Sequence, residues 1–265
     1  MWYEVKGTGS PLLQIGGAGF AHTNFHRVTD TMAQFFTVID MDQSGNGLSD
    51  APVRQYTIDG WADDAAGVLD AAGVGAAFVH GTSTGGMIAL RLATKYPQKV
   101  RALVVGSTAA KYDFMGYAQM RVRRALAETY GLASAELAYD VATLAFSRQA
   151  LSERGPEIVE LARTMREKSN SSFEVWLAMT EAMMDADLRD ELPRIEAPTL
   201  VIGGDQDINT PLDQGPDGAG TRFIAEQIPN AELLVLEGAA HTILVEEPER
   251  VASAVIAFLQ TIEKG

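Results

Sequence analysis

The chain has 265 residues, of which 46% are hydrophobic and 21% charged, and this suits one large domain or a domain that carries a substantial insertion. It contains no cysteine, which excludes disulfide scaffolds, thiolate nucleophiles and iron–sulfur clusters. Asp and Glu outnumber Lys and Arg by 35 to 21, giving a formal charge of -14, and so acidic a surface argues against nucleic acid and anionic membranes as partners.

Short apolar runs rich in β-branched residues alternate along the chain with segments of helical period. This alternation predicts an α/β fold, in which helices flank both faces of a mostly parallel sheet. The apolar runs are, in chain order, Leu12–Ile15, Phe36–Asp40, Ala76–His80, Ala102–Gly106, Thr199–Ile202 and Leu233–Leu236. Helical patterns lie between them at Ile58–Ala72 and Met87–Tyr96, and the clearest one follows Pro248 near the end of the chain.

The third apolar run leads into Gly81-Thr82-Ser83-Thr84-Gly85, and a helical pattern follows at once. A G-x-S-x-G sequence between a strand and a helix is typical of a nucleophile elbow. The serine of such an elbow has a strained backbone, so its neighbours must be small, and the amides of the following helix point at the charge that forms on the substrate. The pattern predicts Ser83 as a nucleophile, with a plain glycine-rich turn as the alternative.

Between Ala110 and Leu192 the alternation stops, and no strand pattern is present. We expect about four helices here, near residues 112–130, 134–151, 156–169 and 173–192. The chain is therefore divided into a core, residues 1–110 and 193–265, and a helical lid, residues 111–192. Six of the ten methionines lie in this insert. They either hold its helices together or form an adaptable apolar pocket above the sheet.

A serine hydroxyl needs a general base, and the chain offers only four histidines. His241 lies in a loop after the last predicted strand, at the end of the sheet where sites of such folds lie. The base needs a carboxylate to orient it. Asp207, which follows the strand Thr199–Ile202, is preferred to Asp205, which lies nearer the turn. His80 belongs to a strand, and we expect it to pack or to form a hydrogen bond beneath the site.

The chain order Ser83, Asp207, His241 is the order of the triad in the α/β-hydrolase superfamily, which this chain resembles over essentially its full length. Residues Ile15–Phe20 fall where that family has its oxyanion loop, and Asp42–Ser49 where it has D-x-R-G-x-G-x-S. The insert resembles the family's lid.

The resemblance implies, by position, that the backbone amides of Ala18 and Thr84 form an oxyanion hole. Within the superfamily the chain is similar to 3-oxoadipate enol-lactonases and related small esterases and lactonases. The segments that carry this likeness are Ser83–Ile88, Arg101–Lys111 and Gly238–His241. It implies a serine hydrolase that cleaves a small ester or lactone through an acyl-enzyme.

Two other functions stay open. Hydrolases that cleave a carbon–carbon bond in ring-cleavage products share this fold and triad, although they usually have an aromatic residue shortly after the histidine, where this chain has Thr242-Ile243-Leu244. Small-molecule receptors of the same fold keep the triad and turn over very slowly. A dehalogenase or an epoxide hydrolase would need a carboxylate at the position of Ser83.

Substrate contacts are the least determined part of the sequence. We expect them from Trp176, Met179 and His22. Arg121, Arg123 and Arg124 form a basic cluster in which one guanidinium binds a substrate carboxylate, or else the cluster is a solvated helix face.

No histidine pair has ligand spacing, so we expect no metal and no cofactor. The N-terminal segment has no basic leader before an apolar stretch, which predicts a cytoplasmic protein that acts on a small molecule. The sequence leaves the oligomeric state open.

Overall fold

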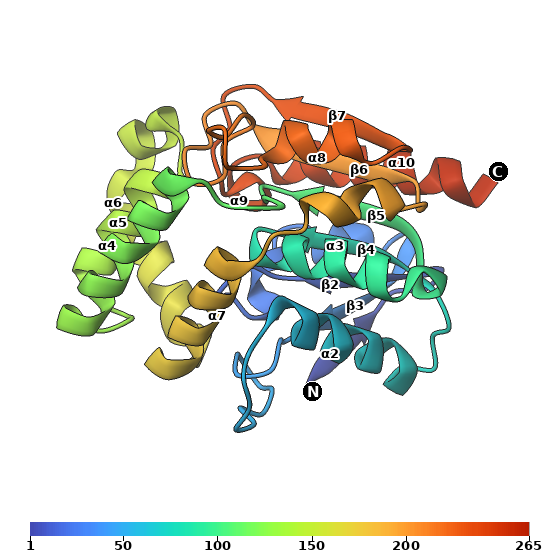
Figure 1. The fold of residues 1–265 in the computed structure, drawn as a ribbon, viewed down its shortest axis with the longest axis horizontal. Coiled ribbons are helices and arrows are strands. Elements are labelled where there is room, and N and C mark those ends of the chain that lie inside the picture. Colours follow the sequence, from blue (N-terminus) through green and yellow to red (C-terminus); the bar gives the residue numbers. More distant parts are fainter. Residues whose placement is uncertain (265) are drawn as a thin grey trace.

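Seven strands form one sheet in the computed structural model, which describes residues 1–264 (Figure 1). Their order is β1-β3-β2-β4-β5-β6-β7, and every neighbouring pair is parallel except β1 with β3. The strands are β1 (Tyr3–Lys6), β2 (Ser10–Ile15), β3 (Phe36–Met41), β4 (Ala77–Thr82), β5 (Val100–Gly106), β6 (Thr199–Gly204) and β7 (Ala231–Leu236). The predicted α/β fold with a mostly parallel sheet is confirmed.

Each of the six predicted apolar runs forms a strand, and the sequence analysis missed only β1 among the described strands. This strand has four residues, Tyr-Glu-Val-Lys, and none of them is fully buried. It pairs antiparallel with β3 at the edge of the sheet, with Val5 opposite Ile39. An edge strand this short carries almost no hydrophobic pattern, so its sequence gives no strand signal.

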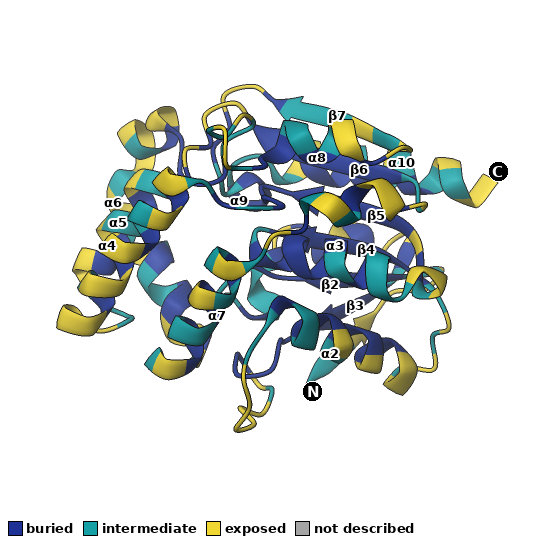
Figure 2. Ribbon diagram, viewed as in Figure 1, coloured by how far each residue is buried: buried dark blue, intermediate teal, exposed yellow. Residues whose placement is uncertain are grey.

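Helices cover both faces of the sheet and seal two apolar cores (Figure 2). On one face lie α2 (Ile58–Ala71), α3 (Thr84–Lys95) and α8 (Thr221–Gln227), which bury Trp61, Met87 and Ile224. On the other lie α1 (Thr29–Met32), α9 (Ile243–Glu246) and α10 (Pro248–Lys264), which bury Met32, Leu244 and Val255. Two single-turn 3-10 helices, η1 (His22–Phe25) and η2 (Pro97–Lys99), complete this part of the chain.

The helical insert, residues 111–192, stands at one end of the sheet (Figure 1). It contains α4 (Phe114–Tyr130), α5 (Ala135–Ala145), α6 (Arg148–Lys168) and α7 (Phe173–Asp185), and the 3-10 helix η3 (Arg189–Arg194) follows. A side chain caps the N-terminus of each α-helix by accepting a backbone N–H three residues later. The caps are Asp113, Ser134, Ser147 and Ser172.

Two predicted boundaries in the insert were wrong. The second helix was expected to run to Leu151, but it ends at Ala145, and the Ser147 hydroxyl accepts the amide of Ala150 at the start of the next helix. The fourth helix was expected to run to Leu192, but α7 ends at Asp185. The expected break before Pro156 is present as non-helical backbone at Arg154, whose φ is -137°, so α6 consists of two helical pieces joined at a kink. Pro156 cannot donate a helical hydrogen bond, which accounts for the kink.

The carboxyl ends of the six parallel strands point toward the helical insert, so the loops that follow them meet between the sheet and the insert. The candidate site residues come from the loops after β2, β4, β6 and β7. Among the described residues, no helix combines the length and apolar composition that a membrane span requires.

Candidate active site

Ser83 stands at the sharp turn between β4 and α3. Its φ of 54° and ψ of -122° place it in a region that residues other than glycine rarely adopt. The turn is held at both ends, because the Ser83 amide donates to the Gly106 carbonyl at 2.9 Å and the Gly86 amide donates to the Ser83 carbonyl at 2.9 Å. This is the strand, strained serine and helix that the G-x-S-x-G pattern predicted.

The glycines on either side of the serine are required by close packing. A Cβ atom on Gly81 would lie 2.2 Å from the carbonyl oxygen of Gly85, and one on Gly85 would lie 2.0 Å from the carbonyl oxygen of Ile15. Both contacts are with backbone atoms, which cannot move aside without shifting the sheet. The helix therefore starts directly against β2 and β4 only because these side chains are absent.

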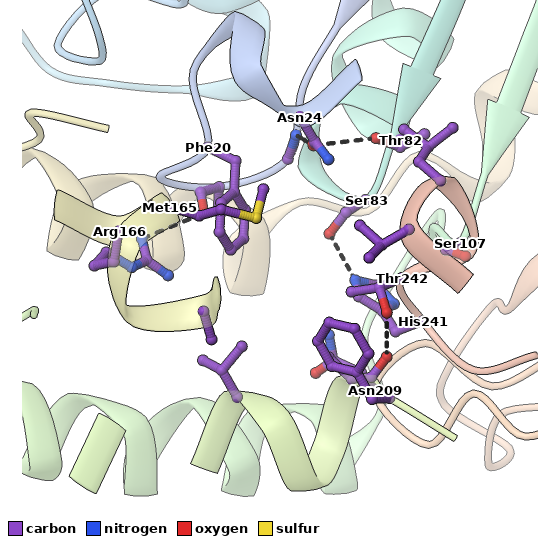
Figure 3. Close-up of a pocket in the computed structure, with 18 of the residues that line it drawn as sticks. Phe20, Asn24, Thr82, Ser83, Ser107, Met165, Arg166, Asn209, His241 and Thr242 are labelled. Atoms are coloured by element: carbon purple, nitrogen blue, oxygen red, sulfur yellow. Dashed lines mark hydrogen bonds between the residues drawn. The ribbon is translucent and has the colours of Figure 1, made fainter. Parts of the chain in front are cut away.

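A chain of hydrogen bonds joins Ser83, His241 and Asp207 (Figure 3). His241 Nε2 lies 3.1 Å from Ser83 Oγ, and His241 Nδ1 lies 3.0 Å from Asp207 Oδ2. When Nδ1 carries the proton shared with the carboxylate, Nε2 is free to accept the serine proton. The structure thus brings together the three residues that the sequence singled out, although His241 is 34 positions from Asp207 and 158 positions from Ser83 in the sequence.

The Asp207 carboxylate is buried and fully engaged. Its Oδ1 accepts the amides of Asn209 and Thr210, each at 2.8 Å, and its Oδ2 accepts the Thr210 hydroxyl at 2.8 Å. Burial alone would raise the pKa of Asp207, but the charge and hydrogen bond of His241 together with the Thr210 bonds hold that pKa below its usual value. The carboxylate is therefore ionised and fixed in position.

Asp205, the rejected alternative, is exposed and accepts the amide of Gly238 at 2.8 Å. It fastens the loop after β6 to the loop after β7, and it is not among the hydrogen-bond partners of the His241 ring within residues 1–264. Thr210 was not predicted as a site residue. Its proximity to Asp207 in the sequence was the available signal, since an aspartate side chain in a loop commonly accepts backbone N–H groups a few residues later and so brings those residues beside it.

The two predicted oxyanion donors lie beside the serine. Thr84 is the first residue of α3, where the helical amides have no intrahelical acceptor and the helix dipole favours negative charge. Ala18 lies in the loop after β2 and lines the cavity at the serine. This loop runs close to Ser83, since a Cβ on Gly17 would lie 3.2 Å from the serine Cβ. The Gly17 amide donates to Asn24 Oδ1 at 2.7 Å, which fixes the loop.

A cavity of about 90 Å³ opens above Ser83, between the sheet and the helical insert (Figure 3). Ser83, His241 and Ala18 lie on its core side. Its walls are largely apolar, and the insert supplies many of them, among them Met120, Phe146, Met165, Trp176 and Met183. Such a cavity suits a small ligand of partly apolar character.

The three predicted substrate contacts have different outcomes. Trp176 lines the cavity and is 2% exposed. Met179 lies outside it, because its position on α7 turns the side chain into the core between the insert and the sheet. His22 also lies outside the cavity, where Asp42 accepts its backbone amide at 2.6 Å and pairs with its Nδ1 at 2.9 Å. The expectations for Met179 and His22 do not agree with these placements.

The basic cluster on α4 separates into three environments. Arg121 is exposed beside Tyr117, and Arg124 is exposed and pairs with Glu128 and Glu181. Arg123 is buried, lines the cavity and pairs with Asp140 at 2.7 Å.

A fourth arginine of the insert, Arg166, also lines the cavity, and the sequence analysis did not find it. The feature of the sequence that could have identified it is its position on the same face of α6 as the buried residues Ile158, Ala162 and Met165.

His80 lies beneath the elbow and packs edge-on against Phe25, with ring centroids 4.9 Å apart. Neither ring nitrogen has a hydrogen-bond partner among the described residues. Burial lowers the pKa of His80 to about 3, so its ring is neutral. Of the two predicted roles, packing is the one that this environment supports. Within residues 1–264 no group of three or more His, Asp or Glu side chains is arranged to hold a metal ion.

The fold and the geometry at Ser83 define the class of protein. A family model described as the alpha/beta hydrolase fold matches residues 11–248, and the chain belongs to this family. The predicted resemblance is confirmed.

Particular relatives extend the comparison. The chain is 35% identical to 3-oxoadipate enol-lactonase 2 of Acinetobacter baylyi over 226 residues, which cover 85% of this chain and 79% of that protein. It is 31% identical to 2-hydroxymuconate semialdehyde hydrolase of a Pseudomonas species over 264 residues, 96% of this chain and 88% of that protein. The solved structure of the enol-lactonase from Burkholderia xenovorans superimposes with a TM-score of 0.85 at 25% identity, covering 98% of this chain and 96% of that one.

Proposed function

We propose that this protein is a serine hydrolase that cleaves a small ester or lactone through an acyl-enzyme. The observation that carries the proposal is the hydrogen-bonded chain from Ser83 Oγ through His241 to the buried Asp207, at an elbow with strained backbone. A serine in this arrangement has a base within reach of its proton and a carboxylate that orients the base.

In the acylation step Ser83 Oγ attacks the carbonyl carbon of the substrate, and its proton passes to His241 Nε2. The negative charge on the tetrahedral oxygen is stabilised by hydrogen bonds from two backbone amides. These are the amide of Ala18, in the loop after β2, and that of Thr84, at the N-terminus of α3. Asp207 stabilises the imidazolium that forms. When the carbon–oxygen bond to the leaving group breaks, the leaving oxygen takes the proton from Nε2, and the acyl group remains on the serine.

Deacylation repeats these steps with water. His241 Nε2 takes a proton from water as the water oxygen attacks the acyl carbon, and the serine leaves with that proton. For a lactone, the leaving alcohol or enol stays attached to the acyl chain, so the product is a single ring-opened acid. We propose that the helical insert acts as a lid over these steps, since its helices form much of the cavity wall.

The comparisons support an ester or lactone as the substrate. The relative from Acinetobacter baylyi is named an enol-lactonase, and so is the superimposed structure from Burkholderia xenovorans. The acyl carbon of an enol-lactone and that of a simple ester undergo the same two steps, so one site suits both. The small volume and the apolar walls of the cavity favour a short acyl chain.

A second candidate is the hydrolysis of a carbon–carbon bond, favoured by the 31% identity with 2-hydroxymuconate semialdehyde hydrolase. The same serine and histidine would serve, but the leaving group would be a carbon atom that must be protonated. The residues after His241, Thr242 and Ile243, place no aromatic ring beside the site at this point of the chain.

The test is the mass of the intact protein after incubation with a fluorophosphonate, for the wild type and for Ser83→Ala. We expect one adduct on the wild type and none on the variant. A panel of short p-nitrophenyl esters, five- and six-membered lactones, and a dienone ring-cleavage product then separates the two candidates. Full esterase activity in Ser83→Ala would refute the proposal. A folded wild type that forms no adduct and turns over nothing would favour a slow receptor of the same fold.

A further inference from the structure

The base segment, residues 240–246, carries the histidine of the hydrogen-bonded chain and is bonded to the helical insert. The Thr242 amide donates to the carbonyl oxygen of Ala145 at 3.0 Å. Oε2 of Glu246 accepts the backbone amide of Ser147 at 2.9 Å. Ala145 ends α5 and Ser147 caps α6, so both bonds reach the junction between these two helices of the insert.

Glu246 also contacts both neighbours of His241. Its Oε1 accepts the amide of Ala240, a buried residue, at 3.1 Å. The same oxygen lies 3.3 Å from the Thr242 hydroxyl, whose one proton goes either to it or to the Ala145 carbonyl oxygen at 3.0 Å. One carboxylate therefore contacts the residue before the histidine, the residue after it and the insert.

Apolar packing connects the same parts of the chain. Val245 is buried in an apolar cluster whose other members belong to the insert, such as Phe146 and Ile158. The two residues before it, Ile243 and Leu244, pack instead in the core on one face of the sheet. The single helical turn α9 is therefore shared between the two parts of the chain, and it lies where the insert meets the sheet (Figure 1).

The backbone of His241 has to be held closely, because its ring serves two partners at once. Nε2 lies 3.1 Å from Ser83 Oγ, and Nδ1 lies 3.0 Å from Asp207 Oδ2. Ser83 stands directly at the end of β4, whereas His241 lies in a loop beyond the end of β7, so the sheet alone does not fix its position. Phe146, between the two bonded residues of the insert, lines the cavity. A ligand in the cavity therefore contacts the insert at the junction that holds the base.

We propose that Glu246 is a positioning residue for the reaction. It fastens the base segment to the junction between α5 and α6, so that His241 is held over Ser83 when the insert is in place. The inference rests on the proposed function, because it concerns how the base of the same site is held and how it is coupled to the insert. Glu246 acts through the backbone on both sides of His241.

The experiment compares two leaving groups on one acyl chain. Ethyl butyrate and p-nitrophenyl butyrate form the same acyl-enzyme, but ethoxide needs a proton from His241 as it leaves, whereas p-nitrophenoxide leaves without one. The ratio of kcat/KM, ethyl over p-nitrophenyl, therefore reports how well the histidine delivers a proton. It is measured in the wild type, in Glu246→Ala and in Glu247→Ala. Glu247 is the next residue, is also half-buried and pairs with Arg250 at 3.4 Å, so its variant is the matched control.

We expect Glu246→Ala to lower this ratio by about tenfold or more, and Glu247→Ala to change it by less than about twofold. A loss of folded protein would lower both rates in the same proportion, so an unchanged ratio in Glu246→Ala would overturn the proposal. If that variant does not fold, Glu246→Gln is measured in its place, with a drop of about threefold or more expected, because the amide keeps one acceptor oxygen and turns an NH2 group toward a backbone N–H. An unchanged ratio in the glutamine variant would have the same meaning.

The insert's part in the connection is tested by removing the Ser147 N–H. Ser147 has a φ of -65°, and Phe146 before it has a φ of -115° and a ψ of 150°, values that suit a proline and the residue before a proline. Ser147→Pro therefore fits the backbone but cannot donate to Glu246. Ser147→Ala loses the capping hydroxyl and keeps the N–H, so it is the control. We expect the ratio in the proline variant to be lower than in the alanine variant by about threefold or more. Equal ratios would show that the insert does not hold the base, against the proposal.

Hydrogen exchange separates this proposal from the proposed function. If Ser83 is not labelled and no ester is hydrolysed, exchange of the Ala240 and Ser147 amides is followed by NMR in the wild type, Glu246→Ala and Glu247→Ala. Exchange of both amides that is faster by about tenfold or more in Glu246→Ala alone would support the connection, even though the hydrolase assignment had failed. Equal exchange in all three proteins would overturn the connection as well.

Discussion

The hydroxyl of Thr210 donates to Oδ2 of Asp207 at 2.8 Å, the same carboxylate oxygen that lies 3.0 Å from His241 Nδ1. The hydroxyl oxygen is itself 3.1 Å from that ring nitrogen. Thr210 therefore lies beside both Asp207 and His241, and its hydroxyl donates its one proton to the Asp207 carboxylate. Together with the two amides on Oδ1, it keeps the buried Asp207 ionised.

Replacing this threonine by valine keeps the volume and removes one donor to a buried charge. We expect Thr210→Val to lower kcat on a p-nitrophenyl ester by about tenfold, because a hydrogen bond to a charged group contributes roughly 1.5–3 kcal/mol. Hydrogen bonding is among the causes that hold the Asp207 pKa low, so the variant should lose activity on the acid side at a higher pH than the wild type. Steady-state kinetics between pH 4 and 9 measure both effects.

Thr210→Ser is the control, since it restores the hydroxyl with a smaller side chain. It should recover most of the wild-type kcat and the wild-type acid limb. Equal losses in the valine and serine variants would show that the methyl group, and not the hydroxyl, matters at this position.

Replacing either of two helical glycines, Gly85 and Gly67, by alanine should change the stability of the protein, and the two changes should have opposite signs. Gly85 lies in the first turn of α3, where a Cβ would stand 2.0 Å from the Ile15 carbonyl oxygen. Gly67 lies exposed on α2, and apart from its chain neighbours and the nearby backbone of its own helix no atom of residues 1–264 lies within 4 Å of its Cβ position. We expect Gly85→Ala to destabilise the protein by about 3 kcal/mol or more, or to prevent folding. Gly67→Ala should stabilise it by roughly 0.5–1 kcal/mol, because alanine restricts the unfolded chain.

Urea unfolding followed by circular dichroism measures both changes. The comparison is informative because the two substitutions are chemically identical, and only the space around the Cβ differs. A stable Gly85→Ala protein with an unchanged midpoint would mean that α3 can move away from β2, and the packing explanation of the elbow would then be incorrect.

The parts of the site that follow from local sequence could be predicted. The strands before Ser83, Asp207 and His241 are buried apolar runs, and each residue follows or ends such a run, so their meeting at one end of the sheet follows from parallel topology. The elbow adds a pattern in which residue size, backbone strain and helix start are all specified within five positions. These signals need no knowledge of distant contacts.

The parts that depend on how a helix is rotated could not be predicted. Met179 and Trp176 are three positions apart on α7, yet one is in the core and the other lines the cavity. Arg166 and the half-buried Arg163 are likewise three apart on α6, and of the two Arg166 lines the cavity. Helical period places such residues on neighbouring stripes, but which stripe faces the serine is set by packing between the insert and the sheet.

His80 should make the protein less stable in acid. It is neutral in the folded state with a pKa of about 3, whereas in the unfolded chain its pKa is about 6.5. Between these values the unfolded state binds more protons, so this residue makes stability rise with pH from about 3 to 6.5. At pH 5 the difference amounts to roughly 2 kcal/mol, from 1.36 kcal/mol for each of about 1.5 pH units.

His80→Leu removes this titration and fills nearly the same volume. We expect the variant to be more stable than the wild type by about 2 kcal/mol at pH 5, and by less at pH 7.5, as measured by urea unfolding at the two pH values. His26→Gln, at an exposed histidine, is the control and should leave the difference between the two pH values as it is in the wild type. If His80→Leu shows the same pH dependence as the wild type, the ring is not neutral in the folded state.

Asp40 on β3 should make the stability of the protein fall as the pH rises, over much of the range in which His80 makes it rise. Burial raises the pKa of Asp40 to about 7, against the lowering effect of the Thr29 hydroxyl, which donates to its Oδ2 at 3.0 Å. Its Oδ1 is enclosed and has no hydrogen-bond partner within residues 1–264. Because the folded pKa exceeds the unfolded value of 3.8, the folded state holds a proton that the unfolded state releases. The stability from this residue is fully present below pH 3.8 and is lost as the pH rises toward 7.

Asp40→Asn mimics the protonated carboxyl at every pH, so it should stabilise the protein most at high pH. We expect a gain of about 2–4 kcal/mol at pH 8 that shrinks toward zero near pH 4, measured by urea unfolding. Asp30→Asn makes the same chemical change at an exposed position on α1 and should alter stability by less than about 0.5 kcal/mol.

Since His80 and Asp40 have opposite effects on stability between about pH 4 and 6.5, the stability of the wild type should vary little in this range. The His80→Leu protein, freed of the histidine, should lose stability steadily as the pH rises; a flat profile in that variant would show that Asp40 is ionised in the folded state.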